Sequence, residues 1–126
     1  MNHTASQPTF DPNCIFCQIA AGRAPANITY QDERVTVFHD IHPITPVHLL
    51  IIPNHHIASL NDTSTDDQDL LGRLVAHARE IAIQLGLDQT GYRLVINTGF
   101  DAGQTVHHLH LHLLGGASMP FHFGDR

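Results

Sequence analysis

A short stretch near the end of the chain alternates histidine with leucine. Residues 107–114 have the sequence HHLHLHLL, and the alternating positions are His108, His110 and His112 against Leu109, Leu111 and Leu113. This period of two predicts a β-strand, because successive side chains of a strand point to opposite faces. We expect the leucines to face a core and the imidazoles to form a row about 6.5–7 Å apart on the other face. Such a row can bind a metal, bind a phosphate or act as a nucleophile.

Two of these chemistries compete for the histidines. Three histidines on one straight strand converge poorly on a single metal ion, and a fourth ligand must come from elsewhere. Alternatively, the middle imidazole attacks phosphorus while its neighbours bind phosphate oxygens, since phosphoryl transfer depends on positioning and charge stabilisation. The glycine-containing loop at residues 99–105 lies directly upstream and can offer backbone N–H groups to an anion. A merely solvated histidine row is the third possibility, and the alternation with leucine argues against it.

Composition limits the partners and the location. The chain has 126 residues, which suits one domain, and its net charge is −6 with no lysine. A polymeric nucleic acid is therefore not an expected partner, and an anionic substrate must be held by arginine, histidine or backbone N–H groups. The sequence shows no run of about 18 apolar residues and no signal-peptide pattern, so we expect no membrane segment and a cytoplasmic protein.

The elements that must position the histidines follow from local patterns. Apolar spacing predicts a short helix at residues 14–22, closed by Gly22, and a long helix at residues 66–85, closed by Gly86. Thr65 is the predicted N-cap of the long helix, and Gln68 completes its capping box. Strands are expected at residues 28–31, 34–39, 47–52, 92–97 and in the histidine–leucine stretch. This order predicts an α+β fold, a mostly antiparallel sheet with the long helix on one face.

Cys14 and Cys17 form a Cys-x-x-Cys pair. Two cysteines are too few for a disulfide scaffold, so the pair is a metal site, a redox pair or two small buried hydrophobes. A redox pair of the thioredoxin kind needs a βαβ setting, which the pattern lacks.

The chain resembles the histidine triad (HIT) family. Residues 103–114 resemble its signature, His-φ-His-φ-His-φ-φ with φ apolar, and four further blocks lie at residues 14–19, 38–43, 47–53 and 94–97. The resemblance covers about residues 14–116, and the ending Gly115-Gly116 is similar to the Hint branch. It implies a five-stranded fold that joins two sheets in a homodimer. The domain is expected at residues 12–116, after a disordered segment at 1–11 and before a tail at 117–126 that lies near the dimer interface and active site.

The resemblance also implies an activity, the hydrolysis of purine nucleoside 5′-phosphoramidates to AMP or GMP. His110 attacks the phosphorus and forms a nucleotidyl-histidine, His112 contacts the phosphate and the leaving group, and His108 and His48 orient the triad. Asp40 accepts hydrogen bonds from the ribose. The expected walls of the base pocket are Ile15, Phe16, Phe38 and Ile41, and the expected phosphate and leaving-group contacts are Asn97, Gly103, Gln104 and Thr105. Thr105 replaces the serine common in this branch, so leaving-group preference is open.

For the cysteine pair, the resemblance implies a structural zinc ion bound by Cys14, Cys17, His56 and His108, a Cys₂His₂ set that suits tetrahedral zinc. The chemistry itself needs no metal. Two alternatives remain open: a nucleotide-binding or scaffold protein with weak catalysis, and a metalloenzyme that uses the triad.

Overall fold

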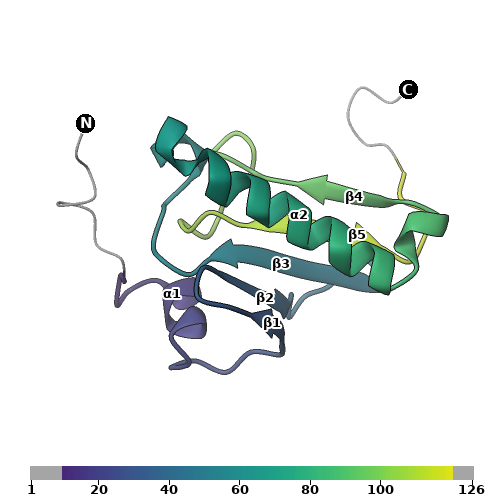
Figure 1. Cartoon of the computed structure of the whole chain (residues 1–126), viewed down its shortest axis with the longest axis horizontal. Coiled ribbons are helices and arrows are strands. Elements are labelled where there is room, and N and C mark those ends of the chain that lie inside the picture. The colour runs from purple at the N-terminus through teal and green to yellow at the C-terminus, as the bar shows by residue number, and fades with distance from the viewer. Residues whose placement is uncertain (1–9, 121–126) are drawn as a thin grey trace.

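The computed structural model describes residues 10–120, which form a five-stranded sheet covered on one face by a long helix (Figure 1). The strands are β1 (Ile28–Gln31), β2 (Val35–His39), β3 (Val47–Pro53), β4 (Tyr92–Val95) and β5 (Leu111–Gly115). The α-helices are α1 (Ile15–Ala20) and α2 (Gln68–Gln84), and the short 3₁₀ turns are η2 (Leu60–Asp62), η3 (Thr65–Asp67) and η4 (Leu87–Gln89). The described helices include none long and apolar enough to cross a membrane.

The sheet has the order β1-β2-β3-β5-β4, and all four pairings are antiparallel. The predicted α+β fold is therefore confirmed. β5 lies inside the sheet, where His112 pairs with Leu50 of β3 on one side and with Val95 of β4 on the other. The histidine–leucine stretch is thus held by hydrogen bonds from two strands that are far from it in sequence.

The regular strand is shorter than predicted, because it begins only at Leu111. The ladder with β3 ends at the pair Ile51–Leu111. Pro53 is the last residue of β3 and has no N–H to donate to a neighbouring strand. Its carbonyl accepts a hydrogen bond from the side chain of His108 and not from the backbone of β5. The chain bends at residues 106–108, and the N–H of Leu109 donates to the carbonyl of Ile57 (2.7 Å).

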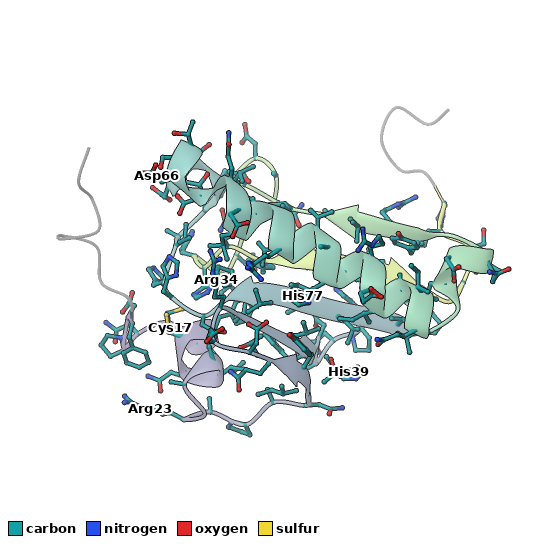
Figure 2. All side chains as sticks on the ribbon, in the orientation of Figure 1. Cys17, Arg23, Arg34, His39, Asp66 and His77 are labelled. Carbon is teal, nitrogen blue, oxygen red and sulfur yellow. The ribbon has the colours of Figure 1, made fainter. Side chains whose placement is uncertain are left out.

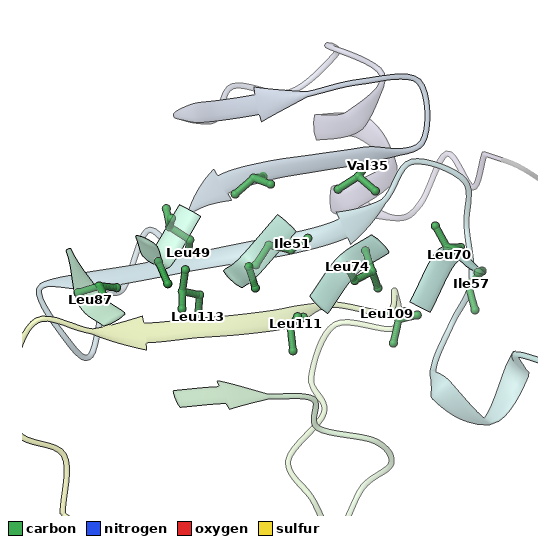
Figure 3. Packing of buried hydrophobic residues seen from close by; sticks show 13 residues of the cluster. Val35, Leu49, Ile51, Ile57, Leu70, Leu74, Leu87, Leu109, Leu111 and Leu113 are labelled. Atoms are coloured by element: carbon green, nitrogen blue, oxygen red, sulfur yellow. The ribbon is translucent and has the colours of Figure 1, made fainter. Parts of the chain in front are cut away.

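The face of the sheet under α2 holds the larger core (Figure 3). Leu109, Leu111 and Leu113 are buried there, which confirms the predicted leucine face. They pack with alternating residues of β2 and β3 and with one stripe of α2, namely Val35, Val37, Leu49, Ile51, Leu70, Leu74, Ala78 and Ala82. Because the strand period is two, burial of these leucines directs His110 and His112 to the opposite face.

The start of the long helix differs from the prediction. A 3₁₀ turn at Thr65–Asp67 precedes α2, and the side-chain cap with its capping box belongs to this turn, at Ser64. α2 itself begins at Gln68, after Asp67. The Ser64 side chain accepts from the N–H of Asp66, and the Asp67 carboxylate accepts from the N–H of Ser64 (2.9 Å). The prediction of Thr65 with Gln68 is therefore wrong by one residue. A carboxylate accepts a stronger hydrogen bond than a neutral amide and also favours a helix N-terminus, so Asp67 closes the box.

The second face of the sheet is covered in part by α1, which lies beside the carboxyl end of β3 (Figures 1 and 2). A smaller core forms there from Phe16, Cys17, Ile19, Phe38, Leu50 and Ile52. Phe10 packs against it, and the guanidinium of Arg23 lies 4.7 Å from the centre of the Phe10 ring. Residues 10–11 of the segment expected to be disordered are thus packed in the structure, and residues 1–9 lie outside the described part. The carbonyl of Met119, in the tail, lies 3.5 Å from Arg93, and the rest of the tail from residue 121 is not described.

Candidate functional site: a histidine cluster between a pocket and a thiol pair

His48 and His112 form a hydrogen-bonded pair on the face away from α2. The Nε2 atom of His48 lies 2.9 Å from Nδ1 of His112. The backbone N–H of Ile44 donates to Nδ1 of His48 (3.2 Å), so the ring proton of neutral His48 is on Nε2. His48 then donates to Nδ1 of His112, which leaves the proton of His112 on Nε2. Burial and the neighbouring histidines lower the pKa of His112 to about 4, and burial also lowers the pKa of His48, so both rings are uncharged at neutral pH.

His110 has the opposite proton arrangement. Its Nδ1–H donates to the backbone carbonyl of His108 (2.7 Å), so Nε2 carries a free lone pair. Burial lowers its pKa, which keeps the ring neutral. The centroids of the His110 and His112 rings are 5.0 Å apart. Neighbouring rings therefore present a lone pair and an N–H, which is what attack on phosphorus and stabilisation of a leaving group require.

His108 does not stand in a row with the other two. It lies in the bend before β5 and is fully buried. Its Nε2–H donates to the carbonyl of Pro53 (2.8 Å), and its Nδ1 lies 3.2 Å from Sγ of Cys14 and 3.5 Å from Sγ of Cys17. The contact of His108 with His110 is made by its main chain. The expected row of three imidazoles is therefore limited to His110 and His112, because the chain bends at residues 106–108 and the alternation of buried leucines begins only at Leu109.

The structure brings together the four residues expected to bind a metal, which we call the Cys₂His₂ cluster: Cys14, Cys17, His56 and His108. Their ligand atoms all lie within 4.8 Å of one another, and Sγ of Cys17 is 3.3 Å from Nδ1 of His56. Ligands of tetrahedral zinc lie about 3.3–3.8 Å apart, given bond lengths of about 2.0–2.3 Å. His55 is exposed and outside the cluster. The set can hold a metal ion.

The proton positions also fit a metal at this cluster. The Pro53 carbonyl holds the proton of His108 on Nε2, so the Nδ1 lone pair points to the sulfurs. An outer hydrogen bond of this kind is usual for a metal-binding histidine. Burial raises the pKa of Cys17 to about 11, so a bound cation is what would keep this thiol in its thiolate form.

A second group, Asp40, His48 and His112, also places its ligand atoms within 4.8 Å of one another. It suits a metal less well. The N–H of Ile44 keeps the proton of His48 on Nε2, which is the atom that faces His112 and lies 3.5 Å from the Asp40 carboxylate. Because that nitrogen has no free lone pair, a hydrogen bond from His48 to His112 suits this group better than a metal ion does.

A pocket of about 450 Å³ lies between α1 and the end of β2, and neither His110 nor His112 is among its lining residues. Six of the expected nucleotide-binding residues line it: Ile15, Phe16, Phe38, Asp40, Ile41 and Thr105. The ring of Phe16 links the pocket to His110, since the two ring centroids lie 5.2 Å apart in an edge-on contact. The volume and the apolar walls with one carboxylate suit a small organic ligand.

The upstream loop departs from expectation at Gln104. Its side-chain oxygen accepts from the N–H of Gly99 (3.0 Å), and its amide donates to the carbonyls of Ala58 (2.8 Å) and Val106 (3.1 Å). This buried side chain therefore holds the loop in shape and does not point a donor into the pocket. Asn97 and Gly103 do not line the pocket either, so their contacts with a ligand stay predictions.

Comparison with known proteins agrees with this architecture. The HIT domain family matches residues 21–119 of the chain. The chain belongs to the HIT domain family. Over 102 residues this HIT protein is 48% identical to the purine nucleoside phosphoramidase of Escherichia coli K12, covering 81% of this chain and 86% of that one. Its fold matches a HIT family hydrolase from Legionella pneumophila with a TM-score of 0.85 and 46% identity, covering 90% of this chain and all of the other.

A histidine triad protein from Clostridium difficile is also similar, with a TM-score of 0.86, 40% identity, and coverage of 89% of this chain and 97% of the other. The predicted family and the prediction of an enzyme are confirmed: this chain is a nucleotide hydrolase of the HIT family.

Two residues of the pocket of this HIT protein were not predicted from its sequence. His39 and His42 both line it, on either side of Asp40 and Ile41. The N–H of His42 donates to the Asp40 carboxylate (2.7 Å), which fixes that side chain at the rim. The one sequence signal for them is that they flank Asp40 and Ile41, which were predicted to bind the nucleotide. A histidine beside a proline-rich loop has no sequence pattern that tells whether it lines a pocket or lies on the open surface.

The buried, neutral His112 makes stability depend on pH. Its folded pKa of about 4 is below the ordinary value of 6.5, so the unfolded chain binds more protons between these values. Its contribution is complete above pH 6.5 and is lost as the pH falls toward 4. We expect the free energy of unfolding to fall by about 1–2 kcal/mol more between pH 7 and pH 5 in the native HIT protein than in His112→Gln, measured by urea unfolding. Equal losses in the two proteins would contradict it.

Proposed function

We propose that this HIT protein hydrolyses purine nucleoside 5′-phosphoramidates through a nucleotidyl-histidine on His110. One observation carries the proposal: His110 and His112 are neighbouring neutral rings with opposite proton arrangements, beside an apolar pocket that ends in a carboxylate. The 48% identical relative named purine nucleoside phosphoramidase supports this choice among nucleotide substrates.

In the first step, Nε2 of His110 attacks the α-phosphorus and forms a P–N bond. The bond from phosphorus to the substrate nitrogen breaks, and that nitrogen takes up a proton from the medium and leaves as the amine. The Nε2–H of His112 is the donor nearest this exchange, where it stabilises the phosphate oxygens and lies on the path of the proton. His48, held by the N–H of Ile44, keeps His112 in the required proton arrangement.

In the second step, water attacks the phosphorus and the bond to His110 breaks. The nucleoside monophosphate leaves, and the proton of the water returns to the medium, so both rings recover their first state. The base lies against Ile15, Phe16, Phe38 and Ile41, and the Asp40 carboxylate accepts hydrogen bonds from the ribose hydroxyls. Thr105 lies at the pocket wall, where the 99–105 loop approaches the phosphate and the leaving group.

The proposal is tested by steady-state kinetics with a fluorogenic AMP-amine substrate. We expect turnover to AMP, and we expect Asp40→Asn to lower kcat/KM by about 10–100-fold, since a hydrogen bond to a charged group contributes about 1.5–3 kcal/mol. With a 2′,3′-dideoxyribose substrate the two proteins should differ much less, because the ribose hydroxyls are absent. Tight AMP binding with no turnover of any phosphoramidate would overturn the activity and favour the scaffold alternative.

We further propose that the ion at the Cys₂His₂ cluster is zinc. Two sulfurs and two imidazole nitrogens are the donor set of structural zinc sites. The cluster ties α1 to the end of β3 and to the bend before β5, so the ion is structural. We also propose a cytoplasmic location, where cysteines stay out of disulfides, as Cys14 and Cys17 do.

A homodimer is the proposed assembly. β1 and β4 are the edges of the sheet, and β4 lies next to β5. An edge strand has unpaired backbone donors and acceptors, so two β4 strands can join two sheets and bring the second chain close to the site. Sedimentation that gives the mass of a single chain would contradict this assembly.

A further inference from the structure

The Cys₂His₂ cluster is joined to the nucleophile by two separate contacts. The first runs through His108, whose side chain lies in the cluster while its backbone carbonyl accepts the Nδ1–H of His110 (2.7 Å). His108 is fully buried, and its other nitrogen is held by the carbonyl of Pro53. A ligand atom and the acceptor that orients the nucleophile therefore belong to one residue with little freedom to move.

The second contact runs through Phe16, which lies between Cys14 and Cys17 in α1 and its cap. The Phe16 ring meets His110 edge-on at 5.2 Å and His108 at 5.9 Å between centroids. The same ring lines the pocket. The position of α1, which its two cysteines set against His56 and His108, thus also sets the wall against which His110 packs.

We propose that the Cys₂His₂ cluster positions His110 for attack, so that Cys14, Cys17 and His56 are positioning residues for turnover without touching the substrate. This inference rests on the proposed function. A bound cation would hold the four ligands together. His108 would then keep its Nε2–H on Pro53 and its carbonyl on Nδ1–H of His110.

The consequence concerns the proton of His110. When its Nδ1–H is bonded to the His108 carbonyl, Nε2 is free to attack. If the bend around His108 loosens, the proton moves between the two nitrogens, and a fraction of the molecules presents an N–H where the lone pair is needed. Loosening should therefore lower kcat more than it changes KM.

His56 is the best position for the test, because it belongs to the cluster and does not line the pocket. With the AMP-amine substrate we expect His56→Ala to lose zinc affinity and to lose about 10-fold or more in kcat, as is usual for residues that support a site indirectly. His56→Cys keeps four zinc ligands and should recover most of the kcat. His55→Ala, at the exposed neighbouring histidine, should behave like the native protein.

A second measurement separates positioning from mere stability. In ¹⁵N-histidine NMR spectra, zinc-loaded protein should show His110 protonated on Nδ1, and His56→Ala should show exchange between both nitrogens that decreases as zinc is added back. A His56→Ala protein with native kcat and a native His110 signal at low zinc occupancy would overturn the inference. If the native protein turned over no phosphoramidate, the proposed function would fail, and the NMR signal of His110 would still decide this inference.

Discussion

Replacing His110 with asparagine is expected to lower kcat with a phosphoramidate substrate by at least about 10³-fold, because the variant has no imidazole lone pair to form the bond to phosphorus. The effect should be on kcat, since the pocket walls and Asp40 remain in place. Rapid-quench kinetics followed by mass spectrometry should detect a nucleotidyl group on the native chain and none on His110→Asn.

His107→Asn is the matched control. His107 belongs to the same stretch but is exposed, and it takes no part in the hydrogen bonds of His48, His110 and His112. It should keep native kinetics. Full activity in His110→Asn, or a nucleotidyl group on another residue, would show that the nucleophile has been assigned to the wrong side chain.

The double substitution Cys14→Ser, Cys17→Ser is expected to remove zinc and to lower the free energy of unfolding by more than about 4 kcal/mol, since loss of a bound metal is among the most costly changes in a small domain. Both side chains are buried, and α1 would keep only its apolar contacts with the sheet. Elemental analysis should find one zinc per native chain and none in the variant, and urea unfolding gives the change in stability.

Native protein treated with a strong chelator is the control, and it should unfold at the urea concentration of the double variant. If the metal persists when both cysteines are absent, the histidine triad holds it, and the assignment of the zinc site is wrong. If the variant loses zinc but keeps its stability, the ion does not tie α1 to the sheet.

Much of the fold followed from patterns within short stretches. The alternation in residues 107–114 predicted the buried leucines, and the apolar spacing of residues 66–85 predicted α2, because both depend on side-chain direction along one element. The capping residue was predicted one position late, at Thr65, because Ser64 and Thr65 are both good caps. The choice depended on which acidic or amide side chain reaches back, and Asp67 does so.

The residues of the candidate site were predicted from the resemblance to the family. Their hydrogen-bond partners became known only from contacts between segments that are distant in sequence. Gln104 was expected to face the phosphate, but it is bonded to Gly99, Ala58 and Val106. His39 and His42 line the pocket, although no sequence pattern predicted this. Neither outcome can be obtained from local spacing, since each depends on segments that meet only in the folded chain.

The histidine–leucine stretch by itself determined which side chains enter the core and which remain for chemistry. Only the tertiary structure decided how each of the three histidines is oriented and which of its ring nitrogens carries the proton. The carbonyl of Pro53 turns His108 toward the thiols, and the carbonyl of His108 frees Nε2 of His110. The N–H of Ile44, acting through His48, leaves a proton on Nε2 of His112. A ring's reactive nitrogen depends on the partner of its other nitrogen. For His108 and His112 that partner, the Pro53 carbonyl or the His48 ring, comes from a segment far away in the sequence.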